Sequence, residues 1–254
     1  MNAPVQVWSC GGGVQSAAIA ALILRGELPK PDVAVIIDTN REKSSTWAYM
    51  DSILTPQMAK FGVRIDRVDS SRFRTCDIWS VNDENLLLPV FTNQSGSNSK
   101  MPAYCSAEWK RDVVSRWLRS LGVETACNWL GISRDEMSRI RAPRSKWLQL
   151  RYPLIFEVPM TRQDCIALVA DMGWPEAPRS SCWMCPNMRD GEWRDMKTSH
   201  PADFESAVSL EREIRARDPH AYFHESMVPL DQVDFENYQG SFADNSCAGG
   251  MCWV

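Results

Sequence analysis

The sequence predicts an α/β protein with a doubly wound parallel sheet, followed by a helical subdomain that carries cysteines. Short apolar runs alternate with helical patterns through the first half of the chain, as in proteins whose parallel strands are joined by crossover helices. Three successive glycines separate the first apolar run from the first helix. Residues 32–38 (DVAVIID) form a continuous apolar run that ends in a carboxylate, as expected for a central strand covered on both faces.

The same patterns set the order of the elements. Residues 70–103 interrupt the alternation with the polar stretch TNQSGSNSK, which predicts a loop or insertion. The predicted strands are residues 6–9, 32–38, 64–68 and 125–131, and the predicted helices are residues 14–25, 45–61 and 107–121.

We expect two regions, a nucleotide-binding α/β domain over residues 1–160 and a helical region with a C-terminal tail over residues 161–254. Thr161 and Asp164 have the spacing of a capping box at the start of a helix. The last fifteen residues, GSFADNSCAGGMCWV, are rich in glycine, so we expect a tail that becomes ordered on binding.

Composition limits the class of protein. The chain has 254 residues and nine cysteines, its first residues do not pair a basic segment with an apolar stretch, and it has no run of eighteen apolar residues. We therefore expect a cytoplasmic protein without a membrane partner, whose cysteines serve metal or redox chemistry rather than disulfides. A net charge of −4 argues against bulk coating of nucleic acid, although residues 134–151 form a local basic stretch.

The glycine turn is a candidate phosphate-binding loop. Gly11, Gly12 and Gly13 lie between a strand and a helix, where backbone N–H groups and the helix terminus attract an anion. Ser9 and Ser16 add hydroxyl donors, and no lysine follows as it would in a GxxxxGK[ST] loop. A tight turn without a ligand is the structural alternative.

At these residues the chain resembles the PP-loop family, the adenine nucleotide α-hydrolase-like proteins whose loop is SxGGxDS. Gly11 replaces the inner serine and Gln15 replaces the aspartate, so GGGVQSAA is closer to the phosphoadenosine-phosphosulfate reductase branch. Residues 38–42 (DTNRE) are similar to the DTGxE segment of that branch, which adds Asp38 and Thr39 to the expected site. The resemblance implies a bound adenine nucleotide such as ATP; whether Mg²⁺ accompanies it is left open.

Cysteines in the second half form a second motif. Cys182 and Cys185 belong to CWMCP, a spacing that allows two thiolates to hold one metal centre. Taken alone, this motif is equally compatible with zinc, with a redox dithiol and with a chance spacing that has no function. Cys105 precedes a predicted helix, and the tail offers Cys247 and Cys252.

This pattern resembles that of the iron–sulfur sulfonucleotide reductases. Cys105 and Lys110 match the first half of their cluster motif, Cys182 and Cys185 match the second, and Tyr104 occupies the place of a paired cysteine. The resemblance implies a four-iron four-sulfur cluster on the three matched cysteines, with an open iron or a fourth thiolate supplied by a tail cysteine, Cys247 or Cys252.

Four segments, GISRDE, RYPLI, MTRQDC and CWMCP, together resemble a phage- and bacterium-encoded branch of the phosphoadenosine-phosphosulfate reductase-like family. That branch is related to the enzyme that inserts sulfur in DNA phosphorothioation. GISRDE places Gly131 and Arg134 among the expected nucleotide-binding residues.

Three functions remain open. In the first, ATP activates an oxygen of a nucleic acid or nucleotide, and sulfur held by the cluster or by the tail thiols Cys247 and Cys252 displaces AMP. Lys110 would stabilise thiolate or phosphate charge, residues 134–151 would receive the substrate's phosphates, and a cysteine desulfurase would supply sulfur. In the second, Cys247 attacks a phosphosulfate and a thioredoxin-type reductant releases sulfite, although the tail lacks the ECGxH form. The third is a silent nucleotide-binding or redox-sensing protein, favoured by Gln15.

Overall fold

The computed structural model describes residues 3–237, so the tail cysteines Cys247 and Cys252 lie outside the described residues. Five parallel strands form the main sheet in the order β3-β2-β1-β6-β7. The order reverses at β1, which confirms the doubly wound sheet. The strands are β1 (Val5–Ser9), β2 (Val33–Asp38), β3 (Ile65–Asp69), β6 (Ala126–Leu130) and β7 (Leu148–Arg151).

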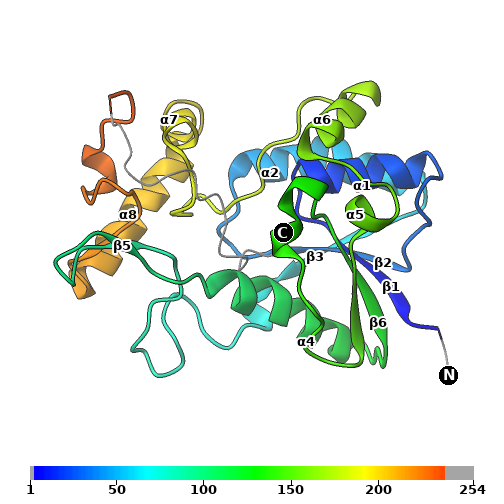
Figure 1. Cartoon of the computed structure of the whole chain (residues 1–254), viewed down its shortest axis with the longest axis horizontal. Coiled ribbons are helices and arrows are strands. Elements are labelled where there is room, and N and C mark those ends of the chain that lie inside the picture. The colour runs from blue at the N-terminus through cyan, green and yellow to red at the C-terminus, as the bar shows by residue number, and fades with distance from the viewer. Residues whose placement is uncertain (1–2, 238–254) are drawn as a thin grey trace.

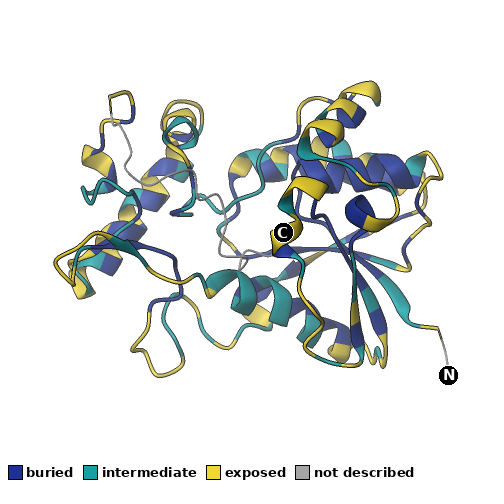
Figure 2. Cartoon of the chain, viewed as in Figure 1, coloured by how far each residue is buried: buried dark blue, intermediate teal, exposed yellow. Residues whose placement is uncertain are grey.

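Helices cover both faces of this sheet (Figure 1). On one face α1 (Val14–Leu24) packs against α6 (Arg162–Asp171), and on the other lies α4 (Asp112–Ser120). Side chains alternate along β1, since Val7 belongs to the core under α4 and Trp8 to the core under α1. Figure 2 shows the resulting buried sheet and the buried length of α1, which explains the apolar runs in the sequence.

Two of the predicted helices contain a π-helical turn. The predicted helix over residues 45–61 consists of α2 (Ser44–Tyr49), a π-helical turn and α3 (Thr55–Lys60). A second π-helical turn, Ala107–Arg111, precedes α4 and contains Lys110. Turns of this kind are frequent at functional sites, because they shift a side chain out of the regular helical register.

The chain forms a second lobe, which contains α7 (Asp190–Ser199) and α8 (Pro201–Arg217) on the left of Figure 1. A small antiparallel sheet in the order β5-β4-β8 accompanies these helices. Its strands are β4 (Phe91–Thr92), β5 (Ser99–Lys100) and β8 (Ala221–Tyr222), so the polar stretch over residues 92–100 is a hairpin.

The cores divide the chain differently from the expected boundary at residue 160. Helix α6 begins with the predicted capping box of Thr161 and Asp164, yet its buried side chains join the core of α1. The core of the second lobe combines residues 86–90 with Trp193 and Phe223. The remaining short elements are α5 (Pro153–Phe156) and 3₁₀ turns at Ser70–Arg72, Arg134–Arg139 and Leu230–Gln232.

Within residues 3–237, every helix is too short or too polar to cross a bilayer.

Candidate functional site

A cavity of about 140 Å³ lies at the carboxyl end of the main sheet, and we call it the cysteine cavity. It is lined by Cys105, Cys182 and Cys185, together with Gln15 at the start of α1 and Thr39 after β2. One buried water needs only about 10–15 Å³, so this space is large enough for a ligand. Ligands of open α/β sheets bind at this edge, where the strand order reverses.

Backbone pairing holds the CxxC segment against the end of β2. Residues 41–43 and 181–183 run antiparallel and bridge at Glu42 and Cys182. The N–H of Trp183 donates to the carbonyl oxygen of Arg41 at 2.9 Å. Because this contact is made by the main chain, it fixes the cysteine beside Thr39 whichever side chains surround it.

The three predicted thiols therefore share one buried environment. Cys185 N–H donates to the carbonyl oxygen of Cys182 at 3.1 Å, which closes a tight turn, and Cys182 Sγ lies 3.6 Å from Thr39 Oγ1. Burial raises the pKa of the Cys105 thiol to about 12, and the charge of Cys185 adds to the rise. Burial also raises the pKa of Cys182. Thiols with such pKa values stay protonated at neutral pH unless a bound cation stabilises the thiolates.

Lys110 supplies a fixed positive charge beside these thiols. Its Nζ lies 3.0 Å from Glu42 Oε1, which also accepts from Thr39 Oγ1 at 3.1 Å. Burial alone would lower the pKa of Lys110, but Glu42 and then Cys182 outweigh it and raise that pKa. The ammonium group is thus held charged next to the CxxC motif.

Cys105, Cys182 and Cys185 provide thiolates, the donor type that an iron–sulfur cluster uses. Over residues 3–237, no three His, Cys, Asp or Glu side chains are placed to hold one ion. A four-iron cluster spreads its thiolates over separate irons, whereas a zinc ion draws four ligands to one centre. Cys105, Cys182 and Cys185 would hold three irons, and no disulfide links the described cysteines.

The glycine turn is closed by packing against another segment. Gly11 to Gly13 are buried, and Ser16 Oγ accepts from the N–H of Gly11 at 2.7 Å. Ser180 Oγ donates to the carbonyl oxygen of Gly11, and a Cβ added at Gly13 would lie 2.9 Å from Ser180 Cβ. Gly12 has φ +72°, a conformation that favours glycine. None of the three glycines lines the cysteine cavity, so their expected role in phosphate binding stays a prediction.

Two other expected nucleotide residues are engaged within the protein. Ser9 Oγ donates to Asn128 Oδ1 at 2.8 Å in the core. Asp38 accepts from Arg67 Nε and Nη2 at 2.9 and 2.6 Å. Of the residues proposed after β2, only Thr39 reaches the cysteine cavity.

Segments after β1 and β6 meet at the reversal of strand order. Gln15 Nε2 donates to Glu136 Oε2 at 3.1 Å, and Glu136 Oε1 accepts from Arg139 at 2.7 Å. Gly131 allows this approach, because an added Cβ there would lie 3.3 Å from Gln15 Cβ. Arg134 is exposed and does not line the cavity.

Several further residues line the cavity, beyond those expected from the sequence. One carboxylate and three cations surround the thiols, and a hydroxyl faces the glycine turn. The sequence does carry a signal for four of them, since Arg179 and Ser180 lie just before the CxxC motif and Glu136 and Arg139 lie within the basic stretch. The full set of these further residues is Glu136, Arg139, Arg162, Arg179 and Ser180.

The chain matches no protein-family model and no curated protein. One similar solved structure is phosphoadenylyl-sulfate (PAPS) reductase from Candida auris in a phosphate complex, with 12% identity, coverage of 72% of this chain and 82% of that chain, and a TM-score of 0.42. Another is the U34-tRNA thiolase NcsA from Methanococcus maripaludis with its 4Fe-4S cluster, with 10% identity, coverage of 92% and 74%, and a TM-score of 0.42.

Proposed function

We propose that this protein is an iron–sulfur-dependent PP-loop enzyme that binds an adenine nucleotide and transfers sulfur to a nucleic-acid or nucleotide substrate. One observation carries the proposal. Cys105 and the CxxC pair come from distant segments, yet they line one cavity with Gln15, which lies in the first turn of the helix after the glycine turn. A thiol-rich centre and a candidate nucleotide site thus lie within reach of each other.

A bound cluster would supply an iron that can hold sulfide close to the substrate. The chain's own groups prepare that place. Lys110 offsets thiolate charge at Cys182, and Trp109 and Met184 line the cavity with apolar surface. An apolar shell of this kind limits the access of water to a metal centre.

The cations of the cavity support the binding of an anionic nucleotide. Arg139, Arg162 and Arg179 line it together with Gln15. Arg139 is paired with Glu136 and Arg179 with Glu192, whereas Arg162 has no ion pair within residues 3–237. Guanidinium groups bind phosphate oxygens through paired N–H donors, so this wall of the cavity suits a triphosphate.

The proposed sulfur transfer has two steps. An oxygen of the acceptor attacks the α-phosphorus of ATP, the bond to the bridging oxygen breaks, and pyrophosphate leaves. A sulfide nucleophile then forms a C–S bond, the C–O bond breaks, and AMP leaves with the oxygen. An adenylated oxygen leaves far more easily than hydroxide. Arginine side chains near the phosphates would stabilise the charge that develops in the first step.

Exposed cations of the basic stretch support a nucleic-acid acceptor. Within the basic stretch Arg139 is buried and Arg151 pairs with Glu157, so neither faces solvent freely. The others lie on the surface and can contact a phosphate backbone. The exposed cations of this stretch are Arg134, Arg141, Arg144 and Lys146.

The cluster is tested by anaerobic reconstitution with iron and sulfide, followed by metal counts and visible absorption. The wild-type chain should hold about four irons and four sulfides. Cys105→Ala and Cys182→Ala should each lose most of the iron and the absorption. Cys76→Ala is the matched control, because Cys76 packs beside the same core without lining the cavity. Equal iron in all four proteins would contradict the proposal.

Turnover is tested with labelled ATP, sulfide and candidate RNA or DNA under anaerobic conditions. Pyrophosphate should appear only when an acceptor is present. Arg162→Ala should weaken ATP binding and so raise the ATP concentration needed for the half-maximal rate. If no acceptor leads to pyrophosphate and the protein instead releases sulfite from a phosphosulfate, the reaction is sulfonucleotide reduction and the proposed sulfur transfer is wrong.

A further inference from the structure

A second hollow lies on the other side of the CxxC segment, and we call it the arginine groove. It encloses about 380 Å³ and is lined by Arg41, Arg74 and Trp183, with Ser206 and Ser209 from α8. Cys182 lines the cysteine cavity and the next residue, Trp183, lines the groove. Consecutive Cα atoms are about 3.8 Å apart, so one stretch of backbone separates the two hollows.

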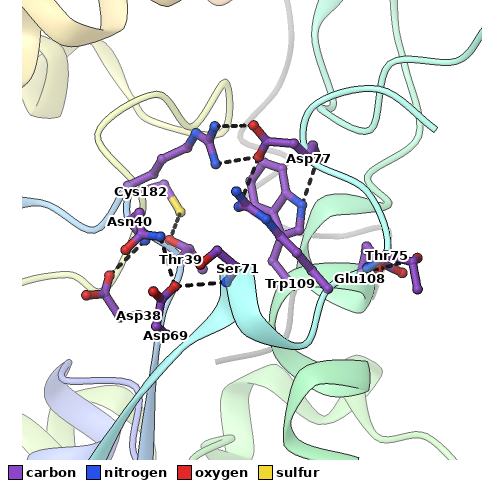
Figure 3. A network of polar contacts seen from close by, with 12 residues as sticks. Asp38, Thr39, Asn40, Asp69, Ser71, Thr75, Asp77, Glu108, Trp109 and Cys182 are labelled. Atoms are coloured by element: carbon purple, nitrogen blue, oxygen red, sulfur yellow. Dashed lines mark hydrogen bonds and ion pairs between the residues drawn. The ribbon is translucent and has the colours of Figure 1, made fainter. Parts of the chain in front are cut away.

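The arginines of the groove share a single carboxylate. Asp77 lies between them, and Figure 3 shows its carboxylate in ion pairs. Arg41 Nη2 donates to Asp77 Oδ2 at 2.9 Å, and Arg74 Nη1 lies 2.9 Å from Asp77 Oδ1. Their side chains are only 13% and 14% exposed, whereas that of Asp77 is 50% exposed. Two largely buried guanidinium groups against one half-exposed carboxylate give this cluster one net positive charge, which Glu213 in the same groove opposes.

The positive charge is also held in place before any ligand binds. Arg41 lies over the ring of Trp109 at 5.1 Å, and Trp109 Nε1 donates to the carbonyl oxygen of Asp77 at 2.8 Å (Figure 3). The Nη1 atoms of Arg41 and Arg74 are buried, and each lies 2.9 Å from Asp77 Oδ1. A cation that is already held in place binds an oxyanion with little further ordering.

We propose that the arginine groove binds a phosphate of a single-stranded nucleic acid, with the adjacent base against Trp183. Guanidinium and hydroxyl groups contact phosphates, and a half-buried indole offers a stacking face for a base. That this nucleic acid is the sulfur acceptor rests on the proposed function, whereas the binding itself does not. The groove would place the acceptor beside the CxxC segment.

One acidic residue in the groove sharpens the test. Glu213 lines the groove and is exposed, so its charge opposes that of a bound phosphate. Removing this charge should strengthen binding, while removing Arg74 should weaken it. A defined site should respond to these two changes more strongly than to the removal of an exposed charge outside the groove, such as Arg212 on the same helix.

The experiment is fluorescence anisotropy of short labelled single-stranded DNA and RNA with the anaerobically purified full chain, without ATP. Arg74→Ala should weaken binding about tenfold and reduce the salt dependence by about one released ion. Trp183→Ala should weaken it by about tenfold or more, and Trp183→Phe should retain most of it. Glu213→Gln should bind more tightly. Arg212→Ala is the control, because Arg212 is exposed on the same helix and does not line the groove.

Competition identifies the source of the phosphate. Unlabelled oligonucleotide should displace the probe at far lower concentration than a mononucleotide, and inorganic phosphate should compete least. A mononucleotide that competes equally well would overturn the nucleic-acid assignment. If Arg74→Ala and Trp183→Ala both bind as tightly as wild type, and thermal unfolding shows that both variants are folded, the proposed binding site is wrong. Binding that depends on Arg74 in a chain without a cluster would leave the site standing and count against the proposed function.

Discussion

Gln15 and Glu136 join the two halves of the sheet at the point where the strand order reverses. Gln15 Nε2 on α1 donates to Glu136 Oε2 at 3.1 Å, and also to Ser133 Oγ at 3.3 Å. Resemblance to the PP-loop family places an aspartate where this chain has Gln15. Here the carboxylate of the cavity comes instead from the segment after β6, and the amide of Gln15 binds it.

Gln15→Asp should therefore destabilise this protein, although aspartate occupies this place in the SxGGxDS loop that the sequence resembles. A carboxylate at residue 15 would face that of Glu136 in a largely buried place, at a cost of about 1–3 kcal/mol in the free energy of unfolding. The double variant with Glu136→Gln should recover most of the loss. Urea unfolding measures both values.

Gln163→Asp is the matched control for this substitution. Gln163 is exposed and occupies the same second position of its helix, α6, as Gln15 does in α1. An added acid there should be neutral or slightly stabilising because it lies near the helix N-terminus. Equal losses in the two helices would mean that the contact with Glu136 is not the cause.

Lys110→Met should be strongly destabilising, because it leaves Glu42 buried without its cation. Breaking a buried ion pair by removing one partner costs about 3–5 kcal/mol. Removing both charges in Lys110→Met/Glu42→Gln should cost clearly less than the single change. Lys60→Met, at an exposed position on α3, should leave the free energy of unfolding nearly unchanged. A double variant no more stable than Lys110→Met would show that the pair is not coupled.

The main sheet could be predicted from the sequence because each of its central strands is a buried apolar run. The apolar residues 33–37 of β2 and the alanine-rich α1 leave few alternatives. β7 was missed, since its four residues at the edge of the sheet lie within the basic stretch. The small sheet of the second lobe could not be predicted either, because β4 pairs with β8 through two residues each, far apart in the chain.

The same distinction applies to the site. Cys182 and Cys185 are recognisable as a local motif, and Cys105 was found by resemblance. Glu136 and Arg179 became part of the cavity only through packing between segments that are distant in sequence. A single sequence carries no local signal for such contacts.

Cys165→Ala should reduce the loss of stability at alkaline pH. Burial raises the pKa of this thiol from 9.0 to about 12 in the folded protein. Above pH 9 the unfolded chain releases the proton while the folded chain keeps it, so stability falls as pH rises towards 12. The slope for one such thiol is at most about 1.4 kcal/mol per pH unit.

Urea unfolding of the reduced protein between pH 8 and alkaline pH measures this slope. Val169→Ala is the control, because it truncates another buried side chain of α6 without removing a thiol. Both variants should be less stable than wild type, but only Cys165→Ala should show a shallower dependence on pH. An unchanged slope would place the thiol in contact with water.

Gly13→Ala tests how the glycine turn supports the CxxC segment. Gly13 has φ −104° and ψ −171°, which alanine also adopts, so only the new contact is at stake. The added Cβ would lie 2.9 Å from Ser180 Cβ and 3.1 Å from Ser180 N, which forces residues 178–181 to move. We expect a loss of about 1–3 kcal/mol in the free energy of unfolding. Iron uptake should also fall although no cysteine is changed, because Ser180 lies two residues before Cys182.

Gly191→Ala in α7 is the control, because an added Cβ there would meet no atom closer than 3.7 Å, and it should be neutral or stabilising. Full iron content in Gly13→Ala would mean that the position of the cysteines does not depend on the glycine turn.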